Sequence, residues 1–258
     1  MASNLLPTPN LIYGTAWKEE RTAALIEMAI RAGFRAIDTA NQRKHYNEAE
    51  VGEGLAAAYR AGVVTRNDLF LQTKFTYLGG QDHRLPYDQK AKPAVQVAQS
   101  LASSLEHLGT DHVDSFVLHG PSSGYEWTDM DAEVWESMVR ERDAGRARML
   151  GVSNVSLRHL QQMAAKHDVR AFCTERKILY QGFSLLTANA EVANHSAVTK
   201  PASRLQATPA QIVFAFSRGV GMLPLTGTTN AEHMKQDLAA MELTLTPNEF
   251  QSIEEIAD

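Results

Sequence analysis

Residues 34–62 read FRAIDTANQRKHYNEAEVGEGLAAAYRAG, and this stretch decides the fold class. Phe34 to Asp38 forms a short apolar run that is typical of a buried strand, and Glu48 to Ala61 has the periodicity of a helix. Gly62 follows that helix, where a residue in the left-handed conformation ends it at low cost. The stretch therefore predicts one strand–helix unit of a parallel sheet.

The same alternation recurs along the chain. The further strands are predicted at Leu11 to Gly14, Leu69 to Lys74, Ser115 to His119, Met149 to Ser153, Ile178 to Phe183 and Met222 to Thr226. The further helices, each followed by glycine, are predicted at Glu19 to Ala32, Ala94 to Leu108 and Ala132 to Ala144. Two later helices are predicted to begin after Thr208 and Thr246, because each threonine precedes a proline and has Gln or Glu three residues on.

Repeated strand–helix units favour either a closed barrel or an open doubly wound sheet. No GxGxxG motif follows the first strand, and polar residues instead end several different strands: Asp38, Lys74, His119, Ser153 with Asn154, and Thr226. Because the top of a barrel collects groups from the ends of many strands, the sequence predicts an α/β fold, a (β/α)8 TIM barrel. We expect residues 1–258 to form a single barrel domain.

The region of the sixth βα unit is short for such a barrel. Val152 and Ile178 are 26 positions apart, whereas two βα units need about 60 residues. Val169 to Cys173 is either a poor sixth strand without its helix or the tail of a helix without its strand. The apparent gap of roughly 20 residues is either a true deletion or a segment that an intact mass above 28.4 kDa would reveal.

Composition excludes several classes of protein. The chain is 44% hydrophobic and carries a net charge of −5, which disfavours general binding to nucleic acid or anionic membranes. The single cysteine, Cys173, excludes an internal disulfide. The start, MASNLLPTPN, lacks the features of a signal peptide, and no run is long enough to span a membrane, so we expect a cytoplasmic protein. None of the nine histidines forms a His-x-His or His-x-x-x-His pair, so no metal site and no metal-dependent hydrolase is predicted.

Asp38 and Lys74 come at the ends of adjacent predicted strands. A buried lysine is costly unless a carboxylate neutralises it, and taken alone such a pair is more often structural than catalytic. Tyr46, in the loop after Asp38, can reach the same place. A phenol beside an ammonium is expected to lose its proton more readily than in water, and could then act as a general acid.

His119 ends the most apolar of these strands and precedes a Gly-Pro turn. Alone, it is equally well explained as a histidine bonded to backbone groups. Together with Asp38, Tyr46 and Lys74 it completes a set that suits carbonyl reduction, in which a hydride arrives on carbon and a proton must reach oxygen.

An ordered set of short motifs runs along the chain: Gly14-Thr15-Ala16, Ile37-Asp38-Thr39-Ala40, Asn47-Glu48 with Val51-Gly52, Thr73-Lys74, Leu118-His119, Gly151-Val152-Ser153-Asn154 and Leu225-Thr226-Gly227-Thr228. In order and spacing this set resembles the aldo-keto reductases, over almost the whole length of the chain. It implies an eight-stranded barrel that uses NADPH or NADH without a Rossmann domain. It also implies that Tyr46 donates the proton, that Lys74 held by Asp38 lowers the pKa of Tyr46, and that His119 orients the carbonyl.

The resemblance also implies a set of cofactor-binding residues. Ser153 and Asn154 match the pair that holds the nicotinamide carboxamide, and Tyr180 matches the aromatic on which the ring stacks. Other matching positions are Gly14 and Thr15 and, for the pyrophosphate and adenosine, Ser184, Leu185, Thr226, Gly227, Thr228, His233 and Asp237. The resemblance favours NADPH, since many family members place Lys and Arg around the adenosine ribose to pair with its 2′-phosphate. NADH is the alternative, because here the closest cation to that site is Lys235.

Two features depart from the family pattern. Tyr46 stands eight residues after Asp38 instead of five, where Arg43 lies, and it is chosen because it directly precedes Asn47-Glu48. The gap before Ile178 falls where the family has its sixth strand and a glutamine that also holds the carboxamide.

The sequence therefore predicts an NAD(P)-dependent oxidoreductase that reduces a small aldehyde or ketone to the alcohol. A cofactor-binding regulatory or sensor protein of the same fold, with little turnover, is the alternative, and a true deletion before Ile178 would favour it. No nucleic acid or membrane partner is expected.

Overall fold

The computed structural model describes residues 9–124, 126–155, 173 and 178–256. The strands are β1 Ile12–Gly14, β2 Ala36–Asp38, β3 Phe70–Phe75, β4 Val113–Leu118, β5 Ala147–Val152, β6 Gln181–Gly182 and β7 Leu223–Thr226. The helices are α1 Thr22–Ala32, α2 Glu48–Arg60, α3 Pro93–Leu108, α4 Asp129–Asp143, α7 Ser196–Leu205, α8 Pro209–Gly219, α9 Ala231–Ala239 and α10 Pro247–Glu254. Each strand and helix predicted within these described residues is confirmed, with ends that differ by a few residues.

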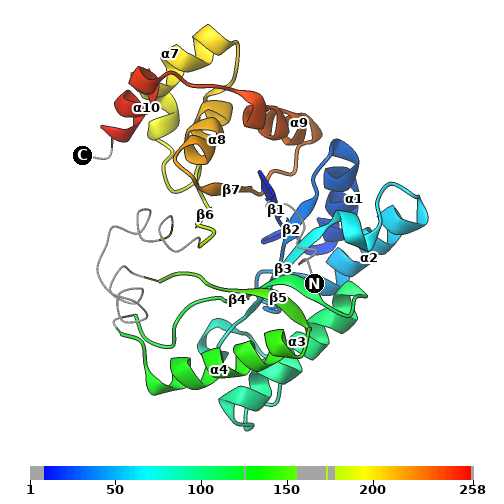
Figure 1. Cartoon of the computed structure of the whole chain (residues 1–258). Helices are drawn as coiled ribbons and strands as arrows, with labels where there is room; N and C mark the ends of the chain where they lie inside the picture. The colour runs from blue at the N-terminus through cyan, green and yellow to red at the C-terminus, as the bar shows by residue number, and fades with distance from the viewer. Residues whose placement is uncertain (1–8, 125, 156–172, 174–177, 257–258) are drawn as a thin grey trace.

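The strands form one parallel sheet in the order β5-β4-β3-β2-β1-β7-β6 (Figure 1). Gly14 lies opposite Asp38, and Asp38 lies opposite Gln72. On the other side of β3, Lys74 lies opposite Val117 of β4. This register places the carboxyl ends of β1 to β4 at one rim of the sheet, as the sequence predicts.

The sheet curls strongly. Four strand spacings separate β3 from β6 in the sheet order, which is about 19 Å in a flat sheet. The side-chain amides of Gln72 on β3 and Gln181 on β6 nevertheless lie 2.9 Å apart. The described strands therefore form an incomplete barrel, with these two amides bonded across its interior.

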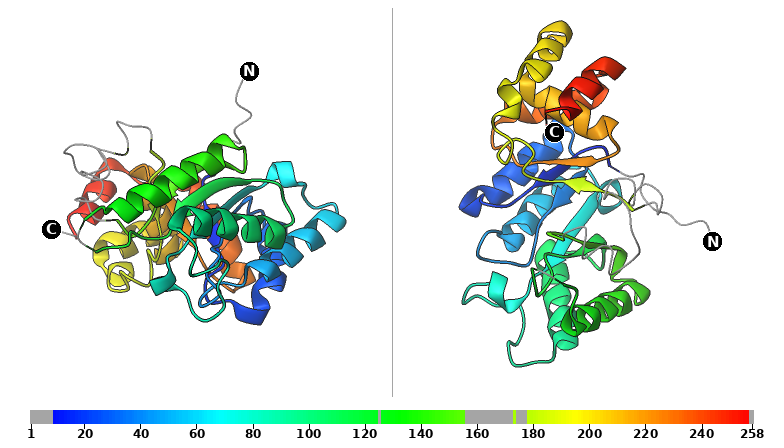
Figure 2. Two further views of the ribbon diagram at one scale, coloured as in Figure 1. Left: turned by 90° about the horizontal axis from the view of Figure 1, so that it is seen from below. Right: turned by 90° about the vertical axis from the view of Figure 1, so that its left-hand side faces the viewer.

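Helices cover the convex face of the sheet (Figure 1), and Figure 2 shows the α7–α10 group and the α3–α4 pair at opposite ends of the molecule. Leu25, Ile26 and Ile30 of α1 and Leu55 of α2 are buried in the main core. All six residues of β3 and of β4 are buried, because both faces of these strands are covered.

A small apolar cluster fills the inside of the curl. It joins Ile12, Ala36, Phe70 and Leu223, with Met149 of β5 packed against it. Because β5 and β7 are far apart in the sheet order, these side chains can meet only across the interior. The cluster lies near the amino ends of the strands and leaves the opposite rim to polar residues.

The predicted helix ends are confirmed. Gly33 after α1 and Gly109 after α3 have φ values of 119° and 62°, which side chains with a Cβ rarely adopt. Thr208 and Thr246 each form a capping box with the Gln or Glu three residues on.

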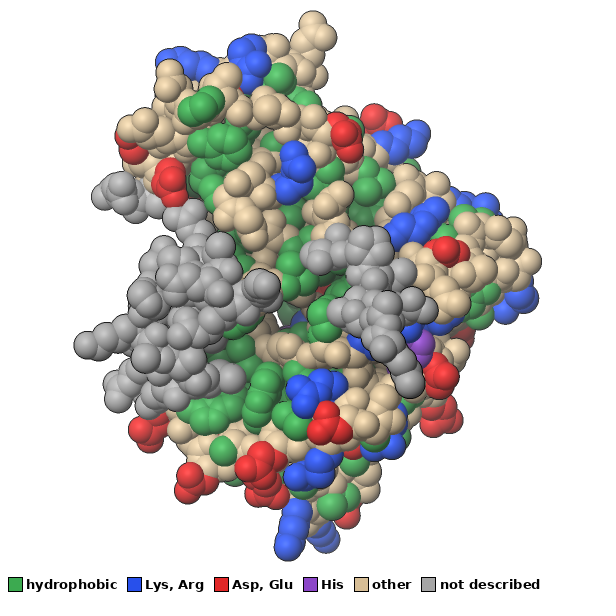
Figure 3. Space-filling view, viewed as in Figure 1, with side chains coloured by type: hydrophobic (Ala, Val, Ile, Leu, Met, Phe, Trp, Pro, Cys, Tyr) green, Lys and Arg blue, Asp and Glu red, His purple; other side chains and the backbone are tan. Residues whose placement is uncertain are grey.

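The predicted strand or helix tail at Val169 to Cys173 lies outside the described residues except for Cys173, which is buried. Most of the interval between Val152 and Ile178 lies outside them as well. In the part of the chain that the structure describes, every helix is too short or too polar to cross a membrane. The face drawn in Figure 3 carries charges of both signs.

Candidate active site

Asp38 and Lys74 form a buried ion pair at the rim of the sheet. The Lys74 ammonium nitrogen lies 2.5 Å from a carboxylate oxygen of Asp38 and also donates to the backbone oxygen of Thr39 at 2.8 Å. Burial is the largest influence and opposes the charge on Lys74, but the Asp38 carboxylate and the Tyr46 phenol together outweigh it, so the pKa of Lys74 is raised. Lys74 is therefore a cation at neutral pH.

The long loop after β2 brings Tyr46 to this pair. The backbone N–H groups of His45 and Tyr46 both donate to the Gln42 carbonyl, so the loop turns back on itself. The Trp17 N–H donates to the His45 carbonyl and ties the loop after β1 to it. The centroid of the Tyr46 ring consequently lies 5.0 Å from the Lys74 nitrogen, despite the extra length of the loop.

The prediction that Tyr46 loses its proton more readily than a phenol in water is wrong, because its pKa is raised. Burial raises the pKa of Tyr46 more than the adjacent Lys74 ammonium lowers it, and the Asp38 carboxylate also raises it. The sequence indicated the neighbouring charge but not the loss of water around the phenol. Tyr46 therefore holds its proton at neutral pH.

His119 lies beside Tyr46, with ring centroids 5.9 Å apart in an edge-to-face arrangement. Its Nδ1 lies 2.8 Å from the Thr76 hydroxyl. Burial, and then the Lys74 charge, lower the pKa of His119 to about 3. The imidazole is therefore neutral, and when the Thr76 hydroxyl donates to Nδ1 the ring proton is on Nε2.

Ser153 and Asn154 lie at the same rim, directly after β5. The Asn154 amide donates to the His119 carbonyl at 2.7 Å and to the Ser153 hydroxyl at 3.2 Å. Asn154 has a φ of 54°, a left-handed conformation that asparagine tolerates better than most residues. The structure thus brings this predicted pair next to His119.

On the β1 and β7 side, several predicted cofactor residues bond within the protein. The Thr15 hydroxyl donates to the Asp38 carbonyl at 3.0 Å, and the Thr226 hydroxyl donates to the Asp237 carboxylate at 2.7 Å. Gly14 packs tightly, because a Cβ there would lie 2.6 Å from the Leu225 side chain. These residues support the rim from within the fold.

The loop after β7 presents backbone groups at the surface. Gly227 is exposed, and its carbonyl accepts a hydrogen bond from the Lys18 ammonium. The Thr228 carbonyl accepts one from the Tyr13 hydroxyl at 3.0 Å. His233 is an exposed residue in the first turn of α9, whose N-cap is Asn230.

Phe183, directly after β6, is an aromatic residue at this rim that the sequence analysis did not assign to the site. Tyr180 precedes β6 and is partly buried, and Ser184 and Leu185 follow it. Phe183 directly after β6 is 54% exposed, an unusual state for phenylalanine. The signal was present in the sequence, since Phe183 is the aromatic adjacent to Ser184 at the strand end.

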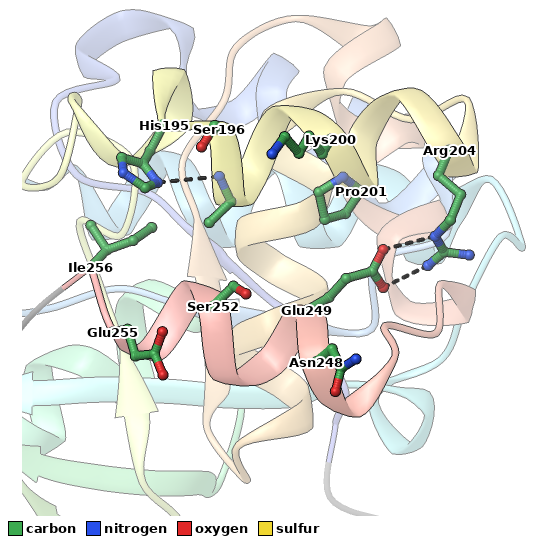
Figure 4. A pocket seen from close by; sticks show the side chains of 11 residues that line it. His195, Ser196, Lys200, Pro201, Arg204, Asn248, Glu249, Ser252, Glu255 and Ile256 are labelled. Carbon is green, nitrogen blue, oxygen red and sulfur yellow. Dashed lines mark hydrogen bonds and ion pairs between the residues drawn. The ribbon is translucent and has the colours of Figure 1, made fainter.

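A groove between α7 and α10 is separate from this rim (Figure 4). It is lined by His195, Ser196, Ala197, Lys200, Pro201, Arg204, Asn248, Glu249, Ser252, Glu255 and Ile256. The Arg204 guanidinium forms an ion pair with Glu249 across it at 2.7 Å. None of the predicted site residues lines the groove. Among the residues described, no group of three or more His, Cys, Asp or Glu side chains could hold a metal ion.

Asp38, Tyr46, Lys74 and His119 thus gather at the carboxyl rim of a curled parallel sheet. The model of the Aldo/keto reductase family matches residues 10–181. The chain belongs to this family, whose members are oxidoreductases acting on carbonyl groups.

Curated relatives align along nearly the whole chain. An aldo-keto reductase of Mycolicibacterium vanbaalenii is 28% identical over 269 residues, covering 97% of this chain and 88% of the relative. Methylglyoxal reductase DkgA of Salmonella typhimurium is 25% identical, covering 97% and 89%. The first alignment is longer than this 258-residue chain, so the relative has residues that this chain lacks.

Solved structures confirm the barrel fold class. A Bombyx mori aldo-keto reductase in complex with NADP has a TM-score of 0.78 at 23% identity, covering 95% of this chain and 88% of that one. An aldo-keto reductase complexed with NADPH has a TM-score of 0.80 at 20% identity, covering 98% and 85%.

Proposed function

We propose that the protein reduces an aldehyde or ketone to the alcohol with NADPH, or with NADH as an alternative, and that Tyr46 supplies the proton. The observation that carries the proposal is the position of the Tyr46 ring, 5.0 Å from the Lys74 ammonium and 5.9 Å from the His119 ring. The complexes of similar reductases with NADP and NADPH support the choice of cofactor.

The residues at the rim fit a nicotinamide cofactor. Asn154 and Ser153 place an amide and a hydroxyl next to His119, and the aromatic residue Phe183 is about half exposed at the end of β6. At exposed Gly227, a Cβ would approach only the Lys18 nitrogen and the Gly14 carbonyl, at 3.6 and 3.8 Å, so the backbone is open there. The cofactor would supply a hydride to the carbonyl carbon.

Tyr46 would hold the proton that the carbonyl oxygen requires. Its raised pKa keeps the phenol protonated before the reaction. Once the proton has left, the Lys74 ammonium lies close enough to stabilise the phenolate, and Asp38 keeps that lysine charged. Tyr46 thus acts as the general acid and Lys74 supplies the compensating charge.

His119 would orient the carbonyl. Because its pKa is about 3, it is a neutral donor and does not compete with Tyr46 as an acid. The contact with Thr76 fixes the ring, so that Nε2 can donate to a carbonyl oxygen at the rim.

The test is the loss of absorbance at about 340 nm when the protein meets NADPH, or NADH in parallel, with a reactive aromatic aldehyde. We expect Tyr46→Phe to abolish turnover, at least 100-fold, while leaving cofactor binding intact. Tyr59→Phe is the matched control, because Tyr59 lies on α2 and its buried hydroxyl has no hydrogen-bond partner among the described residues.

The same assay separates the reductase from the regulatory alternative. Turnover with one cofactor and not the other identifies the preferred cofactor. Tight binding of NADPH, followed by cofactor fluorescence, without turnover of any aldehyde or ketone would contradict the reductase proposal and favour the regulatory protein.

A further inference from the structure

Two glutamines that are not among the proposed catalytic residues bond to each other beneath Asp38 and Lys74. Gln72, on β3 two residues before Lys74, is 2% exposed. Gln181 is on β6, 109 positions later in the chain. The Gln72 amide nitrogen donates to the Gln181 side-chain oxygen at 2.9 Å, and the Gln181 nitrogen donates to the Gln72 oxygen at 2.9 Å.

The Gln72 nitrogen also donates to an Asp38 carboxylate oxygen at 2.8 Å. A carboxylate only accepts hydrogen bonds, so the nitrogen of Gln72 must face Asp38 and its oxygen must face away. That oxygen meets the Gln181 nitrogen, which holds the Gln72 amide in this orientation. Reversing either amide would place two acceptors or two donors against each other.

Gln72 and Lys74 donate to the same carboxylate oxygen of Asp38, at 2.8 and 2.5 Å. The three groups are almost entirely removed from water. In such a buried environment hydrogen bonds are stronger than in water, and a polar group without a partner is costly. The direction of the Asp38 carboxylate therefore depends on Gln72, and the position of the Lys74 ammonium depends on Asp38.

We propose that Gln72 and Gln181 are positioning residues for the reaction: Gln181 orients the Gln72 amide, which fixes Asp38 and thereby the Lys74 ammonium against Tyr46. This inference rests on the proposed function. It assigns the bond across the barrel interior a role in the chemistry as well as in the fold.

A double-mutant cycle in the full chain tests the order of action. We expect Gln72→Leu to lower kcat about tenfold with little change in KM, and Gln181→Leu to lower it about threefold. Because Gln181 acts through Gln72, the double variant should match Gln72→Leu alone. Independent, multiplying losses would overturn the proposal, as would a kcat unchanged in both single variants.

Two further measurements would give the same result as the parent if Gln72 and Gln181 had only a structural role. Gln72→Leu should shift the alkaline loss of kcat to lower pH, by about half a unit. The reason is that Asp38, without the hydrogen bond from Gln72, is no longer held in place against Lys74. Gln181→Glu should be active at low pH, where a protonated carboxyl can both donate to and accept from Gln72. It should lose activity at higher pH, where the carboxylate faces the Gln72 oxygen.

A readout without turnover separates this inference from the proposed function. In protein with isotope-labelled lysine, the NMR titration of Lys74 should move to lower pH in Gln72→Leu. If the parent reduces no carbonyl but this shift occurs, the positioning role stands and the reductase proposal fails. If the parent is active and neither the titration nor the pH profile moves, the positioning role is wrong.

Gln211→Leu is the matched control. Gln211 is a buried glutamine on α8, outside the strands that carry Asp38 and Gln72, and its amide donates to the Gln236 carbonyl at 3.0 Å. We expect it to lower the melting temperature without changing kcat or its pH profile. If Gln72→Leu does not fold, Gln181→Leu and Gln181→Glu carry the test.

Discussion

The Lys74 ammonium nitrogen lies 2.5 Å from an Asp38 carboxylate oxygen, and neither residue exposes more than 7% of its surface. Removing one member of a buried pair leaves the other charge without compensation in a medium of low polarity. The pair therefore links the stability of the fold to the charge that the proposed chemistry needs.

We expect Asp38→Asn to lower kcat by about 10- to 100-fold and the free energy of unfolding by about 3 kcal/mol. Lys74 would remain buried without a counter-charge and would tend to lose its proton. Urea unfolding and steady-state kinetics measure the two effects. Glu27→Gln, which removes an exposed pair with Arg31 on α1, should change neither; an equal loss in both variants would contradict the argument.

The same pair predicts how stability responds to alkaline pH. The pKa of Lys74 is raised above the ordinary lysine value of 10.5, so the contribution of its charge is complete below about pH 10 and is lost as the pH rises through the raised value. The difference in unfolding free energy between the parent and Lys74→Met should be constant from pH 7 to about pH 10 and should shrink above that range. A difference that already falls between pH 7 and 9 would show that Lys74 is not held as a cation.

His119 predicts the opposite behaviour on the acid side. Its pKa of about 3 lies below the ordinary value of 6.5, so the folded protein binds fewer protons there than the unfolded chain. We expect stability to decrease as the pH falls from about 6.5 toward 3, and this slope should be smaller in His119→Asn. NMR should show no titration of His119 between about pH 5 and 8; a midpoint near 6.5 would contradict its burial.

The contact of α2 with α3 predicts a large effect of one methyl group. A Cβ at Gly52 would lie 1.8 Å from the backbone oxygen of His107, which cannot move without shifting α3. Gly52→Ala should therefore lower the free energy of unfolding by about 3 kcal/mol. Gly79→Ala is the control, since a Cβ at Gly79 meets nothing within 4 Å. Thermal unfolding of both variants gives the comparison.

Much of the fold could be predicted because local sequence patterns specify its strands and helices. Strands such as Leu69 to Lys74 are short apolar runs that end in a polar residue, and the first four predicted helices end where a glycine adopts a positive φ. The gathering of Asp38, Lys74 and His119 followed from parallel strands alone, because their carboxyl ends share one rim.

The remaining features depend on contacts that no local pattern contains. Gln72 and Gln181 are 109 positions apart and bond only because the sheet curls. The direction of the Tyr46 pKa shift depends on how much water the folded loop excludes. Phe183 was visible as an aromatic residue, but its exposure is a property of the assembled rim.

The loop between β2 and α2 has a consequence for how such sites are recognised in a sequence. Tyr46 is attached two residues before Glu48, whose buried carboxylate accepts a hydrogen bond from Thr73 at 2.5 Å and so fastens the start of α2 to β3. The phenol is thus held from the helix side of the loop as well as by the Gln42 carbonyl on the strand side. Under the proposed function, a motif counted five residues forward from Asp38 would select Arg43, whereas one counted back from Asn47-Glu48 selects Tyr46.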